Sequence, residues 1–147
     1  MISHLILSKA NYQALHLVCQ QTLQKTNAGA VHVIDRNGVG VTHANRPGYE
    51  LDVDILSSLV SGNVATANAL ASLIGEACFD TQVHQGDQGA FLVTQIGNRL
   101  LLIVWFDQES SVGLVKLVVK NISDSLRPTL DEIERMSTAK AATLLNA

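Results

Sequence analysis

Five histidines and several aspartates are the residues of this chain that could do chemistry, and the histidines are not spaced for it. Histidine supplies acid–base and metal-binding groups, but no two histidines here are close neighbours in the sequence. A hairpin would bring His32 and His43 face to face, yet no cysteine or carboxylate stands at ligand spacing beside them. We therefore predict no metal site and no cofactor. The five histidines are His4, His16, His32, His43 and His84.

The aspartates fall where strands are predicted to end, which is typical of turns. They are Asp35, Asp80, Asp87 and Asp107. No Ser-His-acid arrangement can be argued from residue order, and the sequence contains no G-x-x-x-x-G-K-[ST] phosphate loop. The glycines of QGDQG and GNRLLL lie in predicted hairpin turns, where glycine needs no catalytic explanation. We predict no catalytic residue, and an enzyme is the weakest of the function classes.

Composition indicates one domain and excludes some partners. The 147 residues are 47% hydrophobic and 16% charged, with a net charge of −3, which suits a packed core with a surface poor in charge. Lysine and arginine form no cluster, so nucleic acid is not an expected partner. Cys19 and Cys78 lie in apolar contexts predicted to be helical and are expected to be buried thiols. The start, MISHLILSKANY, lacks the features of a secretory signal, so a cytoplasmic protein is expected.

The segment ILSSLVSGNVATANALASLIG, between Asp54 and Glu76, carries no charge over 21 residues. It is long enough to cross a bilayer, but its serine, threonine and asparagine side chains exclude membrane insertion. On a helix, one row of this segment suits packing on a sheet: Val60, Val64, Ala67, Ala71 and Ile74. A second row has no obvious partner within the chain: Leu59, Gly62, Ala65, Thr66, Ala69 and Leu73. We predict that this second row meets another polypeptide; the alternative is an internal helix in a helix-rich core.

The elements around this helix predict an α+β domain. Residues 8–26 show helical spacing with Ser8 as a possible cap, and AGAVHVID alternates as a strand. Asn37-Gly38 predicts a hairpin to a second strand, and Pro47-Gly48 a turn before the charge-free helix. Three further strands follow, of which LLLIVWF is apolar on both faces and should be central. The predicted order is α-β-β-α-β-β-β-α, with a five-stranded antiparallel sheet and helices on both faces.

The last helical region has one internal stop signal. A buried stripe is predicted at Leu114, Leu117, Val118, Ile122, Leu126 and Leu130. Pro128 should bend or end the helix near residues 125–127. Residues 1–136 are expected to form the domain, and residues 137–147 a flexible tail.

Several short motifs in one order resemble the Roadblock family of dynein light chains and small-GTPase regulators. They are IDRNG at 34–38, GNVA at 62–65, LIGE at 73–76, VHQG at 83–86, and FD followed by Ser-x-Gly-x-Val-Lys-Leu ending at Leu117. The resemblance covers roughly residues 3–127. Within the family, the chain is most similar to the bacterial MglB type of polarity and gliding-motility proteins.

The resemblance implies a homodimer with a shared sheet and the two central helices side by side. It also implies a partner, a Ras-like small GTPase of the MglA type, for which the dimer is a GTPase-activating protein without an active site of its own. Such regulators position the arginine and glutamine of the GTPase, and no arginine lies between Arg46 and Arg99 here. Carried over by position, the GTPase-binding residues are Leu59, Gly62, Asn63, Ala65, Thr66, Ala69, Leu70 and Leu73.

Two other functions stay open from the sequence. A Roadblock scaffold or light-chain dimer would recruit partners through the same helix without altering GTP hydrolysis. A small-molecule sensor would need a pocket with converging polar groups, which the short polar side chains of this helix do not provide. Some proteins of this type have a longer carboxyl-terminal extension linked to nucleotide exchange, so exchange activity is not expected for this shorter chain.

Overall fold

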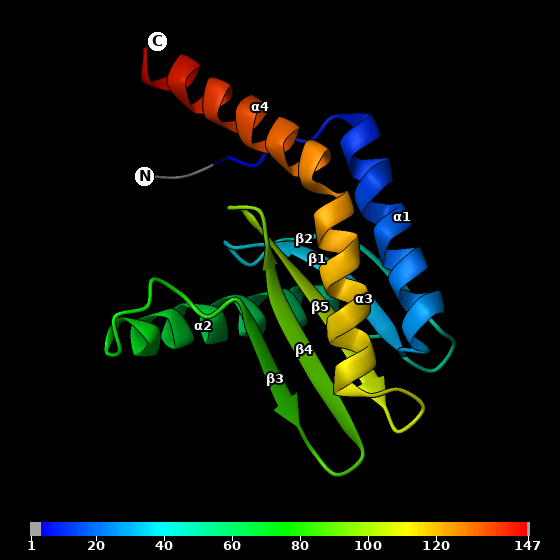
Figure 1. Ribbon diagram of the computed structural model, residues 1–147. Helices are drawn as coiled ribbons and strands as arrows, with labels where there is room; N and C mark the ends of the chain where they lie inside the picture. Colours follow the sequence, from blue (N-terminus) through cyan, green and yellow to red (C-terminus); the bar gives the residue numbers. More distant parts are fainter. Residues whose placement is uncertain (1–3, 147) are drawn as a thin grey trace.

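A computed structural model describes residues 4–146 and has the predicted element order with one more helix at the end. Figure 1 shows the arrangement of these helices and strands. The helices are α1 (Lys9–Thr26), α2 (Val53–Ser72), α3 (Val112–Ser125) and α4 (Arg127–Leu145). The strands are β1 (Ala30–Asp35), β2 (Gly40–Asn45), β3 (Thr81–Gln85), β4 (Gly89–Ile96) and β5 (Leu100–Asp107).

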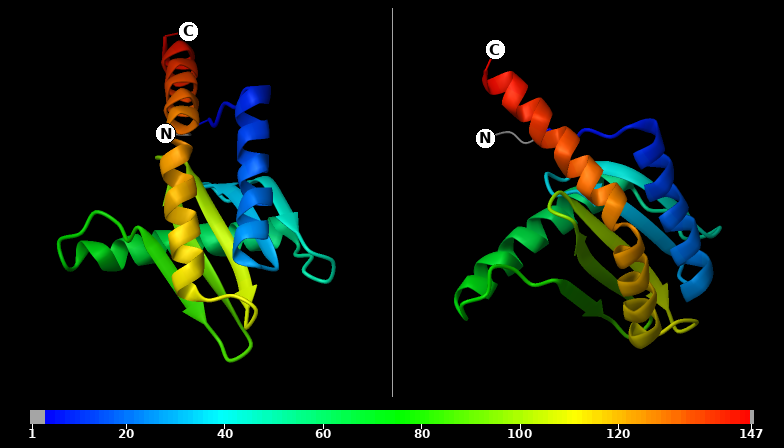
Figure 2. Two further views of the ribbon diagram at one scale, coloured as in Figure 1. Left: turned by 45° about the vertical axis from the view of Figure 1, so that its right-hand side comes forward. Right: turned by 45° about the horizontal axis from the view of Figure 1, so that its top comes forward.

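The sheet has the order β2-β1-β5-β4-β3, and all of its pairings are antiparallel. β5 is therefore central, as its doubly apolar sequence predicts. Helices α1 and α3 lie on one face of the sheet and α2 crosses the other, so both faces are covered (Figures 1 and 2). The fold class predicted from the sequence is confirmed.

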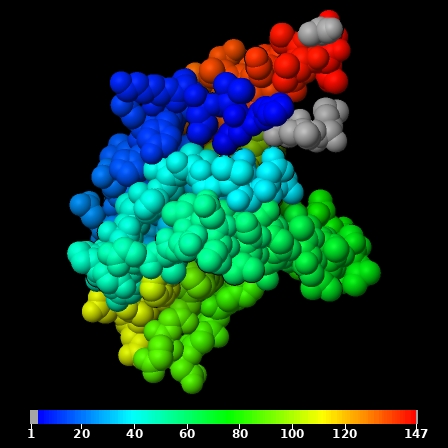
Figure 3. Space-filling view, turned by 180° about the vertical axis from the view of Figure 1, so that it is seen from behind, coloured from blue at the N-terminus to red at the C-terminus, as the bar shows by residue number. Residues whose placement is uncertain are grey.

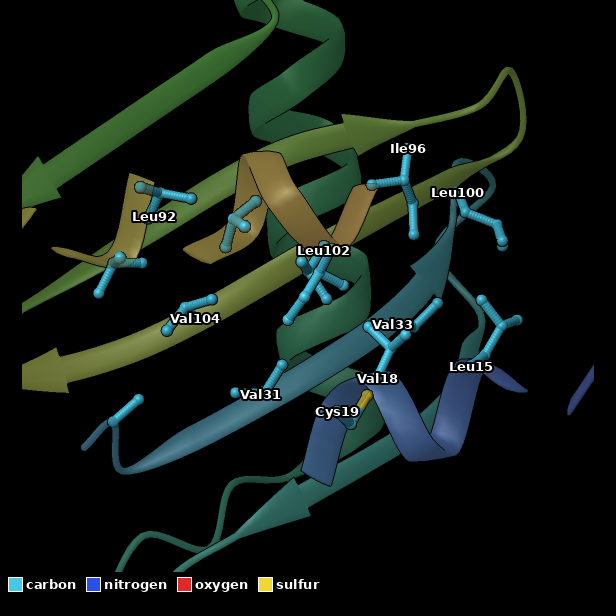
Figure 4. Packing of buried hydrophobic residues seen from close by; sticks show 14 of the residues in the cluster. Leu15, Val18, Cys19, Val31, Val33, Leu92, Ile96, Leu100, Leu102 and Val104 are labelled. Atoms are coloured by element: carbon cyan, nitrogen blue, oxygen red, sulfur yellow. The ribbon is translucent and has the colours of Figure 1, made fainter. Parts of the chain in front are cut away.

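Each face of the sheet has its own apolar core. The larger cluster joins α1 and α3 to alternate residues of β1, β4 and β5, and Figure 4 shows how these side chains interlock. The smaller cluster joins Leu56 and Val64 of α2 to the strand residues that alternate with those of the larger cluster: Ile34, Val93, Leu101 and Ile103. The period-two alternation of β5 therefore serves both clusters at once, which is why its sequence is apolar throughout.

Local signals determine where the elements begin and turn. The side chains of Ser8, Asp52 and Ser111 accept hydrogen bonds from backbone N–H groups three residues on, at the starts of α1, α2 and α3. Asp35 likewise accepts from the N–H groups of Asn37 and Val39, which holds the β1–β2 turn. Gly38 adopts a φ of +91°, a conformation that side chains disfavour, so the Asn-Gly hairpin prediction is confirmed.

The buried stripe predicted for the last helical region is correct at Ile122 and Leu126, and Val118 and Leu130 pack against the core, but it is wrong at its first two residues. Leu114 and Leu117 are exposed, whereas Val115 and Val119 face the sheet with Ile122 and Leu126. The segment VGLVKLVV is apolar on more than half of its circumference, so spacing alone does not determine which side is buried. The stop predicted at Pro128 is confirmed, since α3 ends at Ser125 and α4 begins at Arg127.

Helix α4 includes part of the segment expected as a tail, because it continues to Leu145. Ile133 and Ser137 are its buried residues, and the Ser137 hydroxyl accepts a hydrogen bond from the backbone of Ile6. Arg99 pairs with Glu134 at 2.8 Å and ties the β4–β5 turn to this helix. Beyond these contacts α4 projects past the sheet (Figure 1). Residue 147 lies outside the described part.

The two cysteines differ, which corrects the prediction that both are buried in helices. Cys19 is fully buried in α1, and burial raises the pKa of its thiol to about 12. Cys78 follows the end of α2, outside any helix, and is only half-buried. Helix α2 ends at Ser72 and is followed by a turn in which Gly75 has a φ of +79°, so the helix does not reach Cys78.

Gly29 provides a test of how tightly the loop before α2 is packed. A Cβ atom at this position would overlap the aromatic ring of Tyr49, which lies directly against the Gly29 backbone. We expect Gly29→Ala to lower the free energy of unfolding by about 1–3 kcal/mol, because Tyr49 or the backbone must move. Chemical denaturation measures this change. Gly113→Ala is the matched control, since a Cβ there meets open space; an equal loss in both variants would contradict the packing described.

Candidate functional site

Helix α2 is the candidate site because only one of its sides is covered. Leu56, Ser57, Val64 and Ala71 are its buried residues, and Leu56 and Val64 pack against the apolar residues of the sheet. Its outer side is seen directly in Figure 3, where nothing from the same chain lies over the helix. The exposed fractions reach 69% at Leu59 and 79% at Leu73, which is high for leucine. The alternative considered from the sequence, in which this helix is buried inside a helix-rich core, is therefore wrong.

All eight residues expected to bind a partner are exposed: Leu59, Gly62, Asn63, Ala65, Thr66, Ala69, Leu70 and Leu73. They form two adjacent rows and not one, as helical spacing requires. The first row is Leu59, Asn63, Thr66 and Leu70. The second is Gly62, Ala65 and Ala69, and Leu73 lies beyond the last residue of the helix. The row predicted to pack on the sheet faces inward as expected, except for Ile74. This residue is 71% exposed because the helix ends before it.

Leu59 and Asn63 of the first row line a hollow between α2 and the strands β3 and β4. The hollow has a volume of about 380 Å³. One wall is formed by Leu51, Ile55, Leu59 and Val60, and the other by His84, Phe91 and Val93. Asp52 and Asn63 complete the lining, so apolar side chains predominate. The hollow reaches β3, the edge strand, which pairs only with β4. An apolar hollow beside an unpaired strand edge favours association with another chain.

The second row lies on the other side of the helix, beside the β1–β2 turn. The hydroxyl of Ser61 donates a hydrogen bond of 2.6 Å to the backbone carbonyl of Arg36. Gly38 lies close to the backbone of Ser57 and Ser58, so this turn rests directly on the helix. Ala65 is one helical turn on from Ser61, so the backbone of Arg36 lies near the small residues of the second row. The exposed guanidinium of Arg36 donates a hydrogen bond of 3.3 Å to the backbone carbonyl of Asn98 in the β4–β5 turn.

Helix α2 also overhangs the sheet. Its carboxyl-terminal end extends past β3 in each view (Figures 1 and 2). Leu70 is 57% exposed. The overhang and the hollow are thus two separate apolar surfaces at the same edge of the sheet.

The loop that leads into α2 is held by a cluster of polar and aromatic contacts. The Tyr49 hydroxyl donates to the carboxylate of Asp107, and the Tyr49 ring meets Trp105 edge-on at 5.0 Å between centroids. This hydrogen bond lowers the pKa of Asp107 and raises that of Tyr49. Arg46 donates to the carbonyls of Ala28 and Asn27, binds Glu109 and lies over the Tyr49 ring. These contacts determine where α2 starts on the sheet.

Groups with catalytic potential do not gather near α2. Across residues 4–146, no three His, Cys, Asp or Glu side chains are placed to hold a metal ion. His32 and His43 do face each other, as the hairpin predicts, with ring centroids 4.8 Å apart. Within the same range, no helix combines the length and apolar character needed to cross a membrane.

Sequence reasoning missed several residues of this surface. Leu51, Ile55 and Phe91 line the hollow, and the backbone of Arg36 contacts α2 near the second row. Phe91 was identifiable as the alternate residue of a strand face, because it shares a face with Val93. Nothing in the sequence indicated that Arg36 lies near α2, because this position depends on how the β1–β2 hairpin packs against the helix.

Comparison with known proteins agrees with this geometry. The Roadblock/LC7 domain model matches residues 15–106. The gliding protein MglB from Thermus thermophilus has 35% sequence identity and a TM-score of 0.81, over 90% of this chain and 99% of that one. Myxococcus xanthus MglB has 34% identity and a TM-score of 0.79, over 88% and 96% of the two chains.

Two further comparisons add less about function. A structure described as MglB with a tetrameric arrangement has 33% identity and a TM-score of 0.82, over 90% of this chain and 99% of that one. A sequence search against curated proteins gives no match.

Proposed function

The chain belongs to the Roadblock/LC7 family, and from this premise we propose that it is a homodimeric regulator that activates GTP hydrolysis by a Ras-like small GTPase of the MglA type. The observation that carries the proposal is the outer side of α2, which carries no charge after Asp54 and is not covered by the described residues of its own chain. The proposed setting is polarity and gliding motility in the bacterial cytoplasm, in line with the named gliding protein that it resembles.

The proposed dimer pairs the overhang of one chain with the hollow of the other. A two-fold axis beside β3 would bring the two edge strands together and extend the sheet. It would also place Leu70 and Leu73 of one α2 over the hollow lined by Leu59 and Phe91 of the other. Burying one exposed leucine stabilises an interface by about 1.5–3 kcal/mol, and each contact of this dimer occurs twice.

The proposed GTPase contact uses the second row, which this dimer leaves free. Gly62, Ala65 and Ala69 project little beyond the helix backbone, so another protein can approach it closely. Arg36, whose backbone contacts α2 and whose exposed guanidinium lies at the Asn98 carbonyl, adds one positive charge at the rim of this contact, which fits an acidic group on the partner.

The proposed mechanism is positioning of the GTPase, because α2 has no residue with which to act on a nucleotide. No arginine or other cation lies within this helix, so it cannot supply an arginine finger. A regulator of this kind accelerates hydrolysis by holding the GTPase so that its own arginine and glutamine reach the nucleotide. A Roadblock scaffold would use the same surface without accelerating hydrolysis. Single-turnover hydrolysis by the GTPase, with and without this protein, distinguishes the two functions.

Leu59→Arg tests the dimer. Because this leucine borders the hollow and is exposed in the single chain, the variant should fold but shift to monomer, with dimer dissociation increased at least about 30-fold. Sedimentation measures the mass, and circular dichroism checks the fold. Leu17→Arg is the matched control, an exposed leucine on α1 at the opposite face. A dimer that persists unchanged in Leu59→Arg places the interface elsewhere.

Ala65→Arg and Ala69→Arg test the GTPase contact. A long cation on either small residue should prevent close approach and weaken GTPase binding by about 100-fold or more, while the dimer stays intact. Binding is measured by titration of the GTPase loaded with a non-hydrolysable triphosphate. Ala10→Arg, an exposed helical alanine on α1, is the control. Full stimulation of hydrolysis by either α2 variant would overturn the assignment.

Arg36→Ala separates positioning from a supplied arginine. As a rim charge, Arg36 should affect mainly the rate of association, about 3- to 10-fold and more at low salt, with little change in hydrolysis at saturation. Arg36→Lys should retain the effect of the charge. A fall in saturated hydrolysis of about 10³-fold would instead identify Arg36 as an arginine finger and contradict the proposed mechanism.

A further inference from the structure

A buried histidine pair lies on the same face of the sheet as α2. His32 of β1 is opposite His43 of β2, and the two rings stack at 4.8 Å between centroids with 10° between their planes. His32 is 2% exposed, whereas His43 is open to solvent. Across the other neighbour, β5, His32 is opposite Ile103, which belongs to the apolar cluster under α2. One ring therefore lies in the interior and the other closes its route to water.

The interior position suits only the neutral form of His32. Its Nε2 atom is buried and has no hydrogen-bond partner. A protonated ring would need acceptors for both of its N–H groups, and an unmatched buried charge is much less stable than an unmatched neutral group. Burial, and then the charge on His43, lower the pKa of His32 from its ordinary 6.5 to about 4.

The groups around the pair do not compensate such a charge. On β2 the facing titratable group is His43 itself, and on β5 the opposite residue is apolar. In the loop before α2, Tyr49 and Arg46 are engaged with Asp107 and Glu109. At the start of α2, Asp52 caps the helix and Asp54 is exposed. Within residues 4–146, no carboxylate forms an ion pair or hydrogen bond with His32.

We propose that the stacked His32–His43 pair is an acid-sensitive latch, which holds the edge strand β2 and the loop into α2 in place only while His32 is neutral. A proton from solvent binds a ring nitrogen of His32, and the ring then leaves its site on the side closed by His43. Because β2 leads through Arg46 and Tyr49 to the first turn of α2, this movement loosens the start of that helix. The latch rests on the fold alone; its effect on a GTPase rests on the proposed function.

The sign of the effect follows from the two protonation states. Above pH 6.5 both the folded and the unfolded chain have neutral His32, and the contribution to stability is complete. Between pH 6.5 and about 4 the unfolded chain binds a proton that the folded chain excludes, so stability falls as the pH falls. The unfolding equilibrium constant should rise by up to about 300-fold over this range from His32 alone.

Local opening is tested by hydrogen exchange and by a histidine titration. At about pH 5, after correction for intrinsic exchange rates, amides of β2 such as Ala44 should lose protection that amides of β5 keep. His32→Phe, which fills the site with an uncharged ring, should remove this difference, and His4→Gln, at an exposed histidine, should not. Equal loss in β2 and β5, or an unchanged response in His32→Phe, would overturn the latch. Nuclear magnetic resonance of the wild-type ring checks the same point without a variant: titration near 6.5 would also overturn it.

The functional arm measures binding of the triphosphate-loaded GTPase between about pH 7 and 5. A fall in affinity that is absent in His32→Phe would link the latch to α2, and a fall shared by both would contradict that link. Absence of GTPase binding at every pH would contradict the proposed function, whereas the exchange experiment would still decide the latch.

Discussion

The constraint on which the structure depends is that a single helix covers one face of a five-stranded sheet. Helices α1 and α3 share the other face, but α2 alone must shield the apolar residues of β1, β4 and β5. Only one side of α2 packs on the sheet. The helix crosses the sheet at an angle, so parts of β3 and β4 remain uncovered beside it (Figure 3). The hollow, the overhang and the bare outer side all follow from this crossing. The absence of charge in α2 after Asp54 then reflects both surfaces that the helix meets: the sheet of its own chain and, as proposed, another protein.

The position of α2 depends in turn on its connections. The loop before it is held by Tyr49 and Arg46, which bridge β5, the end of α1 and the segment after β5. The β1–β2 turn supports it from the side through Ser61. Neither contact contributes to the apolar core, yet together they determine which residues of α2 face outward. Polar contacts therefore position a surface that is itself apolar.

Periodicity predicted the elements well because each is amphipathic or alternates, and Asn37-Gly38 and Pro128 marked their ends. It failed where a segment is apolar on several sides: Val115 and not Leu114 faces the core, and Ile74 lies past the helix end. Six of the eight candidate residues were predicted to face another chain because the sequence offers no partner for them, whereas Asn63 and Leu70 were added only by the family resemblance. The division of the eight residues into two rows, and Arg36 beside one of them, could not be predicted, because both depend on contacts between segments distant in the chain.

The sheet order also has a consequence for how the molecule assembles. The β1–β2 hairpin and the β3–β4–β5 meander each form from neighbouring segments, but β1 meets β5 across about 70 residues of chain. The seam between these halves is the pairing with the largest loop to close, so it should form last and limit the folding rate. Helix α2 is the covalent link between the halves and also packs over their seam. The segment offered to other proteins is thus the one that completes the fold.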